Sequence, residues 1–274
     1  MINLKIDNMK HQHKSIIDGS NEQTSENAEV KTAEVKAEKK TEKPKKAPKP
    51  KAPVELKDYG FVAVCMGKGI TNILKDLGVD RVIEGGQTMN PSTEDFVSAV
   101  EKLNADHIFI LPNNSNIVLA ASQAAQVCSD QDIHVLPSKT IPQGLSACVM
   151  FNPDVELEDN LAEMNEAIEN VKSGEVTYAI KDTTYDGLEI KKDEYMGIFG
   201  KDICVSCPDC MEATKKLLDK MLDDDSELVT LIYGDTATEE QAEEIAAYIE
   251  DNSDAEVEIH EGNQPVYSFI IGVE

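Results

Sequence analysis

From Tyr59 onward the sequence alternates regularly between short β-branched runs and amphipathic stretches. Four of the runs predict strands that are buried on both faces, over residues 61–66, 81–85, 107–112 and 132–137. Helices are predicted between and after them, near residues 69–77, 91–103, 115–128 and 142–150. Because parallel strands need a long crossover connection, usually a helix, this alternation predicts a mostly parallel sheet with helices on both faces.

The rest of the chain has a different pattern. Residues 157–174 predict a helix that stops at Gly174, and the next segment shows period-two alternation with an Asp186–Gly187 turn, which is typical of antiparallel strands. A helix is predicted near residues 209–222 and another over 238–251, with strands around them. The predicted fold class is therefore α/β with two lobes, a mostly parallel sheet with flanking helices and then a mixed sheet.

The expected domain organisation follows from these patterns. Residues 1–18 are too few to fold alone, and residues 19–54 are a Lys-, Glu- and Pro-rich stretch that predicts a disordered linker. The parallel lobe is expected over residues 55–155, a connecting helix over 156–174 and the mixed lobe over 175–274. The lobes also share an order of strand, Gly, helix, strand and then EGGQ or EGNQ, which predicts a repeated unit, although a Gly-rich turn after a strand is common by itself.

The chain is strongly acidic, with 52 Asp and Glu against 26 Lys and Arg. Residues 1–54 hold 12 Lys and 8 acidic residues, which leaves 14 basic and 44 acidic residues, a net charge of −30, in residues 55–274. Contact with phosphates needs clustered Lys and Arg, so nucleic acid and anionic membranes are excluded as expected partners. The acidic helical stretches 156–169 and 239–250 are either a docking face or simply solvated faces.

The cysteines and the amino terminus bear on the compartment. Three of the six cysteines lie in strongly apolar stretches, and buried free thiols suit a reducing cytoplasm better than a disulfide framework. The first residues lack the apolar core of a signal peptide, and no run approaches the ~18 apolar residues of a membrane-spanning helix. We therefore expect a cytoplasmic protein without membrane insertion.

Three polar segments follow predicted strands, where open α/β folds place their ligand sites. In residues 84–95, EGGQTMNPSTED, the pair of glycines permits close backbone approach, Asn90 suits a helix N-cap and Pro91 the first helical position. Asn113 and Asn114 are expected as caps in the second segment. Capping and turn chemistry without a ligand explains these residues equally well. The candidate ligand- or partner-binding residues are Gly85, Gly86, Gln87, Thr88, Asn90, Ser92, Thr93, Asn113, Asn114, Thr140, Gln143, Gly144 and, from the second copy of the repeat, Gln264.

Catalytic and metal motifs are weak. The sequence has no Walker A, G-x-G-x-x-G or G-x-S-x-G motif, so neither a nucleotide cradle nor a nucleophile elbow is predicted. Cys204, Cys207 and Cys210 have C-x2-C-x2-C spacing, but a fourth cysteine is missing nearby, which favours incidental or redox-sensitive thiols over a metal site. His11 and His13 have no third ligand near them and are expected to face solvent.

Long segments of the chain resemble a known family. GGQTMNPSTED, LPNNSNIVLAA, KTIPQGL, VTYAIKDT and QPVYSFIIGVE resemble the C-terminal domain of the fatty-acid kinase A subunit, from a group of bacterial DAK2 or DhaL-domain proteins, over about residues 57–274. LKIDNMKHQH resembles the last helix of that family's middle domain. The resemblance implies a two-lobed, DegV-like fold and an enzyme whose kinase domain binds ATP and magnesium. The triple-cysteine segment and Cys148 depart from the family pattern, and His11 and His13 do not match its catalytic His pair.

The resemblance also implies a function. The C-terminal domain is expected to dock a fatty-acid-loaded, DegV-like B subunit with a basic surface, whose fatty acid is phosphorylated to acyl-phosphate by a kinase domain in cis or in trans, outside this sequence. No catalytic residue, cofactor or metal is assigned to the chain itself, which is expected to be non-catalytic alone. The alternative is a two-lobed α/β protein that binds a small ligand, a fatty acid or an anion, in its crevice.

Overall fold

The protein is described from a computed structural model, which defines residues 56–86 and 89–274. The predicted helix remnant over residues 1–18 and the linker over 19–54 lie outside the described residues, and so do Gln87 and Thr88. Among the helices of the described ranges, none is long and apolar enough to cross a membrane.

The first lobe is built on a four-stranded parallel sheet. Its strands are β1 (Lys57–Cys65), β2 (Arg81–Glu84), β3 (Ala105–Leu111) and β4 (Asp132–Val135), in the order β2-β1-β3-β4. The helices that connect or follow the strands are α1 (Lys68–Asp76), α2 (Thr93–Val100), α3 (Val118–Val127) and α4 (Ile141–Met150). The prediction of a parallel sheet with flanking helices is confirmed.

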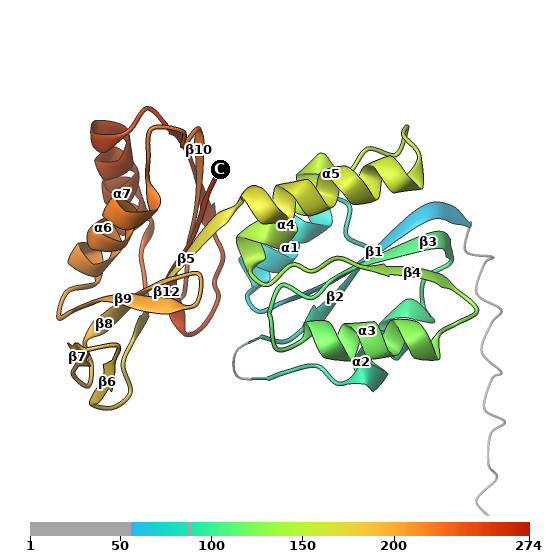
Figure 1. Ribbon diagram of the computed structural model, residues 1–274, viewed down its shortest axis with the longest axis horizontal. Coiled ribbons are helices and arrows are strands. Elements are labelled where there is room, and N and C mark those ends of the chain that lie inside the picture. Colours follow the sequence, from blue (N-terminus) through green and yellow to red (C-terminus); the bar gives the residue numbers. More distant parts are fainter. Residues whose placement is uncertain (1–55, 87–88) are drawn as a thin grey trace, which may run out of the picture. The chain divides into compact units, whose positions relative to one another are not determined.

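Helices cover both faces of this sheet (Figure 1). Successive strand residues point to opposite faces, so Phe61 and Phe109 join the core beneath α1, α4 and α5 (Leu157–Asn170), whereas Val62 and Ile108 join a separate core with α2 and α3. Such two-sided burial explains why the strands are continuous apolar runs rather than alternating ones.

Two predicted helix boundaries are wrong. The N-cap of α2 is Ser92, not Asn90, because Ser92 and Asp95 form a reciprocal capping box that starts the helix after Pro91. Helix α5 ends at Asn170, and Gly174 is not its stop signal but a residue of β5 (Lys172–Tyr178). A Cβ at Gly174 would lie 2.4 Å from the sulfur of Met221, so glycine is needed for close packing of a helix on this strand.

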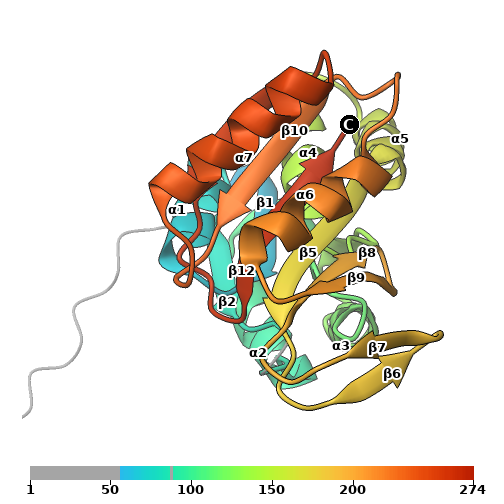
Figure 2. The same cartoon turned by 90° about the vertical axis from the view of Figure 1, so that its left-hand side faces the viewer.

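The second lobe has a mixed, six-stranded sheet. Its order is β11-β10-β12-β5-β8-β9, in which β10 and β11 are parallel and the other pairs are antiparallel. Helices α6 (Cys210–Met221) and α7 (Glu239–Asn252) lie against one face (Figure 2). The remaining strands are β8 (Tyr195–Phe199), β9 (Asp202–Cys207), β10 (Leu228–Tyr233), β11 (Glu256–Glu261) and β12 (Tyr267–Val273).

The predicted Asp-Gly turn forms a separate small hairpin. Strands β6 (Thr183–Tyr185) and β7 (Leu188–Ile190) pair antiparallel across Asp186 and Gly187, whose φ angles are 45° and 84°. Two successive positive φ angles are the requirement of a type I′ turn, which Asp-Gly meets at low cost. Strand β9 was not predicted, because its residues DICVSC contain two of the three cysteines that were considered only as a ligand motif.

The predicted repeat is visible as two parallel β-α-β units, β1-α1-β2 and β10-α7-β11. The loop after β11 in the second unit packs against the start of α1 in the first. The backbone N–H groups of Gly69 and Ile70 donate to the carbonyl oxygen of Gly262 at 3.0 and 3.3 Å. Since α1 has no side-chain cap, this carbonyl satisfies two of the amides that every helix leaves unpaired at its start.

The contact leaves no room for side chains. A Cβ at Gly69 would lie 1.7 Å from the carbonyl oxygen of Glu261, and one at Gly67, where φ is 102°, would lie 2.5 Å from that of Gly262. The core also crosses between the lobes, because Ile232 and Ile270 of the second lobe pack into the cluster that holds Phe61 and Phe109.

We expect Gly69→Ala to destabilise the protein by about 1–3 kcal/mol, because the new methyl group must displace backbone atoms of the β11–β12 loop. The urea midpoint of the unfolding transition measures this. Gly86→Ala is the matched control, since its Cβ would meet only the flexible side chain of Met66, at 3.3 Å. Equal midpoints for the two variants would contradict the role given to the loop contact.

Candidate functional site

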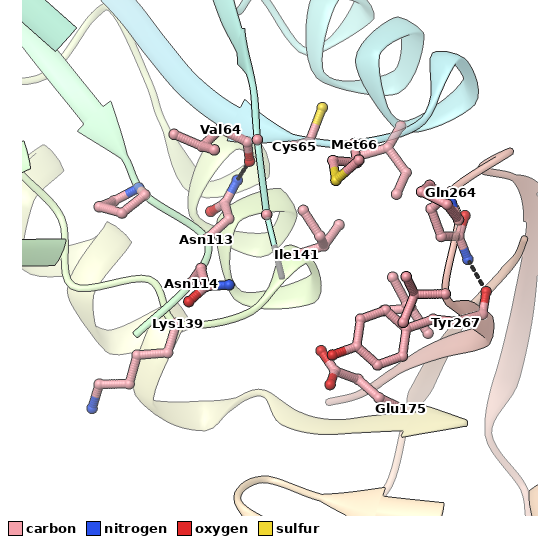
Figure 3. A pocket seen from close by; sticks show the side chains of 17 residues that line it. Val64, Cys65, Met66, Asn113, Asn114, Lys139, Ile141, Glu175, Gln264 and Tyr267 are labelled. Atoms are coloured by element: carbon pink, nitrogen blue, oxygen red, sulfur yellow. Dashed lines mark hydrogen bonds between the residues drawn. The ribbon is translucent and has the colours of Figure 1, made fainter. Parts of the chain in front are cut away.

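A small cavity lies where β1 and β3 of the first lobe end, and β5 and the loop before β12 close it from the second lobe (Figure 3). Its volume is about 50 Å³. Apolar side chains such as Ile70, Ile141 and Ile270 form part of the wall. The polar groups of the lining are contributed by Asn113, Asn114, Lys139, Glu175, Gln264 and Tyr267.

Five of the residues predicted from the sequence line this cavity. They are Gly85, Gly86, Asn113, Asn114 and Gln264. Their convergence reflects the parallel sheet, which brings the carboxyl ends of successive strands to one edge. Gly85 also has a packing role, since a Cβ there would lie 2.6 Å from the ring of Pro91.

Asn113 is held by the fold. It is buried at a φ of 54°, its amide nitrogen Nδ2 donates to the carbonyl of Val64 at 3.1 Å, and its Oδ1 accepts from the hydroxyl of Ser138 at 2.8 Å. A Cβ at Gly144 would lie 2.0 Å from Asn113 Oδ1, so Gly144 is required by this cluster. Asn113 therefore joins β1, β3 and the segment after β4 rather than capping a helix, as was predicted.

Asn114 is not a helix cap either, because α3 begins only at Val118 after Ile117. Its Oδ1 accepts from the backbone N–H of Asn116 at 2.9 Å, which forms a local turn. With the oxygen engaged in this way, the amide nitrogen of Asn114 is directed towards the cavity (Figure 3). Asn114 is thus a donor available at the wall.

The other predicted residues lie outside the cavity lining. Thr140 caps α4 and shares a hydrogen bond of 2.7 Å with Ser173, whereas Gln143 accepts from the N–H of Lys139 and donates to the carbonyl of Ile168 at 2.9 Å. Gly144 packs on Asn113, as described above. In the α2 segment, Ser92 is the cap, the Thr93 hydroxyl donates to Gln123 at 3.2 Å, and Asn90 is exposed.

Gln264 has an unsatisfied acceptor. Its side chain is 2% exposed, and Nε2 donates to the carbonyls of Ile232 and Tyr267, each at 3.3 Å. Its Oε1 is buried with no hydrogen-bond partner among the described residues. A buried amide oxygen normally accepts at least one hydrogen bond, so this atom is a point of attachment for a donor group or a water molecule.

Glu175 and Tyr267 were missed by the sequence analysis. On β5, Gly174 and Val176 face α6, so the alternation of the strand points Glu175 to the opposite side, towards the first lobe. Burial raises the pKa of the Glu175 carboxyl, and the Tyr267 hydroxyl, which is directed at it in Figure 3, interacts with it and partly offsets that rise in pKa. A lone acidic residue inside an otherwise apolar strand was the signal available in the sequence.

The arrangement is suited to binding a small polar group rather than to nucleophilic catalysis. The one thiol of the described lining, Cys65, has a pKa raised by burial and is therefore protonated at neutral pH. The described residues of the lining include no histidine that would serve as a base. An amide donor, an ammonium group, an amide acceptor and a protonatable carboxyl remain.

The three cysteines of the C-x2-C-x2-C segment do not come together as a ligand set within the described part of the chain. Cys204 and Cys207 lie on β9, and Cys210 begins α6. All three are free, and burial raises the pKa of each thiol, which is the reverse of what a reactive or metal-binding thiolate requires.

We expect Glu175→Gln to stabilise the protein near neutral pH and to have little effect near pH 4. Because burial raises the folded-state pKa of Glu175 above the usual 4.5, the wild type loses stability as the pH rises through that higher value, and the neutral amide does not. Urea midpoints measured from pH 4 to pH 8 give the difference. Glu163→Gln on the exposed face of α5 is the control; a parallel response of both variants would contradict the burial argument.

Comparison with known proteins assigns a family. The model of the FakA-like C-terminal family of fatty acid kinases matches residues 60–274. Protein YloV of Bacillus subtilis is 46% identical over 275 residues, and an uncharacterized protein of Staphylococcus aureus strain USA300 is 40% identical over 275 residues. In both cases the match covers all of this chain and 45% of the relative, so the chain spans less than half the length of these proteins.

Solved structures show the same fold at low sequence identity. A Thermotoga maritima protein described as having a fatty acid binding function has a TM-score of 0.60 and 13% identity, over 80% of this chain and 99% of that one. Fatty acid kinase (Fak) B3 of Streptococcus pneumoniae, loaded with linoleic acid, has a TM-score of 0.51 and 12% identity, over 79% and 99% of the two chains.

The dihydroxyacetone kinase of C. freundii in complex with AMP-PNP and Mg2+ has a TM-score of 0.57 and 12% identity, over 79% of this chain and 48% of that one. These likenesses confirm the predicted two-lobed, DegV-like α/β fold. Together with the match over residues 60–274, they show that the chain belongs to the FakA-like family of fatty acid kinases, of which it contains the C-terminal domain.

Proposed function

We propose that this domain docks a DegV-like B subunit loaded with fatty acid, which it presents to the kinase domain that phosphorylates the fatty acid to acyl-phosphate. The observation that carries the proposal is the match to the C-terminal domain of the FakA-like family over residues 60–274. A kinase subunit needs a means of recognising its partner, and this domain has no catalytic constellation among its described residues.

The cavity supports a binding module more than a lipid container. Ligand pockets usually enclose ~300–1,000 Å³, whereas the cavity between the lobes is about 50 Å³. Such a volume holds a few water molecules or one small group, and a long acyl chain does not fit in this conformation. Sharing a fold with fatty-acid-binding DegV proteins therefore does not by itself make this chain a fatty-acid carrier.

Charge complementarity is the second support. The net charge of −30 over residues 55–274 favours a partner with a basic docking surface, since opposite potentials accelerate encounter and suppress wrong partners. Helices α5 and α7 carry exposed acidic side chains that make no ion pair among the described residues, including Glu163, Glu166, Glu243 and Glu250. Free thiols throughout the described chain fit the proposed cytoplasmic setting.

ATP and magnesium belong, in this proposal, to a kinase domain outside this sequence, in the same polypeptide or in another. The residues present do not fit either group: the cavity contains a single exposed Lys, the sequence has no glycine-rich phosphate-binding motif, and no cluster of carboxylates converges within the described ranges. No step of phosphoryl transfer is assigned to this chain.

A second candidate function, the binding of a small ligand, has one specific observation in its favour. The buried, unpaired Oε1 of Gln264 offers an acceptor in the cavity wall next to the donor of Asn114. Thermal melting in the presence of fatty acids and small anions tests this function. A shift in wild type that is lost in Gln264→Met supports it, and a flat response to every compound excludes it.

For docking, we expect a DegV-like protein from the same genome, loaded with oleic acid, to bind this chain in calorimetric titration at about 0.05 M salt. Affinity should fall about tenfold at about 0.3 M salt, because the Debye length shortens and the attraction is screened. An unrelated basic protein is the control for non-specific attraction. Absence of binding at low salt to both the loaded and the empty partner would refute the proposal.

Two matched variants locate the docking face. Glu163→Gln with Glu166→Gln neutralises α5, and Glu243→Gln with Glu250→Gln removes the same charge from α7. We expect one pair to weaken binding severalfold and the other to leave it unchanged, with urea midpoints near the wild-type value for both. If neither pair changes the affinity, the acidic helices are solvated faces and not the docking surface.

A further inference from the structure

Three potential metal ligands converge at the edge of the first sheet, away from the cavity. His107 lies on β3, and Asp132 and His134 lie on the neighbouring edge strand β4. In the parallel register His107 pairs with Asp132, and Phe109 pairs with His134. The three residues lie towards the starts of these strands, whereas the cavity described above lies at their carboxyl ends.

The ligand atoms are close together. His107 Nδ1 lies 2.6 Å from Asp132 Oδ2, and His134 Nε2 lies 3.0 Å from the same oxygen. The three ligand atoms all lie within 4.8 Å of one another. In a tetrahedral zinc site with bonds of about 2.0–2.1 Å, neighbouring ligand atoms are roughly 3.3 Å apart, so small side-chain rotations are enough to admit an ion.

The geometry leaves one of these atoms unsatisfied. Although Asp132 Oδ2 is near, His134 Nε2 is buried and makes no hydrogen bond within the described structure. One carboxylate oxygen is thus placed between two imidazole nitrogens and is hydrogen-bonded to His107 alone. A cation in the same position would bond to all three atoms and resolve the unpaired nitrogen.

Both imidazole rings are held in place by aromatic neighbours. The ring of His107 lies 5.5 Å from that of Tyr59, and the ring of His134 lies 5.8 Å from that of Phe109, which is itself buried. The side chains remain accessible, with exposed fractions of 34% for His107, 23% for His134 and 50% for Asp132. The rings are therefore oriented by the core, and an ion has a path from solvent.

We propose that His107 Nδ1, Asp132 Oδ2 and His134 Nε2 form a binding site for a divalent transition-metal ion of the zinc class, with a fourth position open to solvent. Two imidazoles and one carboxylate are the donor set that zinc and its neighbours in the first transition row prefer over magnesium or calcium. The ion occupies the position between the rings and breaks the hydrogen bond between His107 and Asp132.

Binding requires a defined protonation state. The metal bonds to the unprotonated nitrogen of a neutral imidazole, so the remaining proton lies on Nε2 of His107 and on Nδ1 of His134. Protonation of either ring competes with the metal, and affinity falls as the solution becomes more acidic. The open fourth position is available to water or to a side chain of another protein.

The test is a calorimetric titration of the full chain with Zn2+ at pH 7.5 in a buffer that does not chelate metals. We expect one equivalent to bind, and Asp132→Asn and His134→Gln each to weaken it by about tenfold or more. His260→Ala is the matched control, because His260 lies 3.6 Å from Glu258 in a comparable but two-residue pair. His11→Ala with His13→Ala excludes the remaining histidines of the chain.

Cobalt separates this site from the cysteines. Co2+ bound by thiolates absorbs strongly in the near ultraviolet, whereas Co2+ bound by imidazole and carboxylate shows only weaker visible bands, which is the expected result. Nitrogen chemical shifts of the histidine rings report ligation by Nδ1 of His107 and Nε2 of His134, including in any variant whose urea midpoint has fallen. Unchanged zinc affinity in both ligand variants, thiolate absorption only, or no binding at hundreds of micromolar Zn2+ would each overturn the proposal and leave a hydrogen-bonded His-Asp pair.

Discussion

The amino-terminal amides of α1 are completed by a carbonyl group from the other lobe. Gly69 and Ile70 donate to Gly262, and glycines 67 and 69 let the two backbones approach without side chains between them. Each hydrogen bond contributes a net ~0.5–1.5 kcal/mol, but leaving the buried amides unpaired would cost more. Helix α1 and the β11–β12 loop therefore depend on each other, and that loop contributes Gln264 to the cavity wall.

Polar residues at the strand ends contribute mainly to the architecture. Asn113, Ser138 and Gly144 form a buried cluster in which the amide of Asn113 bonds to β1 and to the segment after β4. Gln143 links the start of α4 to the end of α5 in the same way. What remains for a ligand is the surplus: a donor on Asn114, an acceptor on Gln264 and the carboxyl of Glu175.

The fold was largely predictable because it follows from periodicity. Continuous apolar strands separated by helices allow few arrangements other than a parallel sheet, and the Asp186–Gly187 turn is dictated by its two positive φ angles. The site was predictable only in position. Sequence spacing brings Asn113, Asn114 and the Gly85–Gly86 pair to one edge, but it does not show that Asn113 is saturated by backbone and hydroxyl partners. Helix boundaries failed where a local choice decided, as when the Ser92–Asp95 capping box took precedence over Asn90.

The parts of the chain that sequence alone did not reveal are those that depend on long-range register. Glu175 faces the first lobe because Gly174 and Val176 face α6, and Gln264 is buried because its loop packs against α1. His107 and His134 are 27 positions apart, yet the parallel pairing of β3 with β4 sets them on either side of Asp132. Histidine spacing in the sequence has no short metal-binding motif, and only the sheet makes these residues neighbours. A fold shared with fatty-acid-binding proteins thus keeps a crevice of about 50 Å³, and its distinctive chemistry lies in charge and in residues brought together at sheet edges.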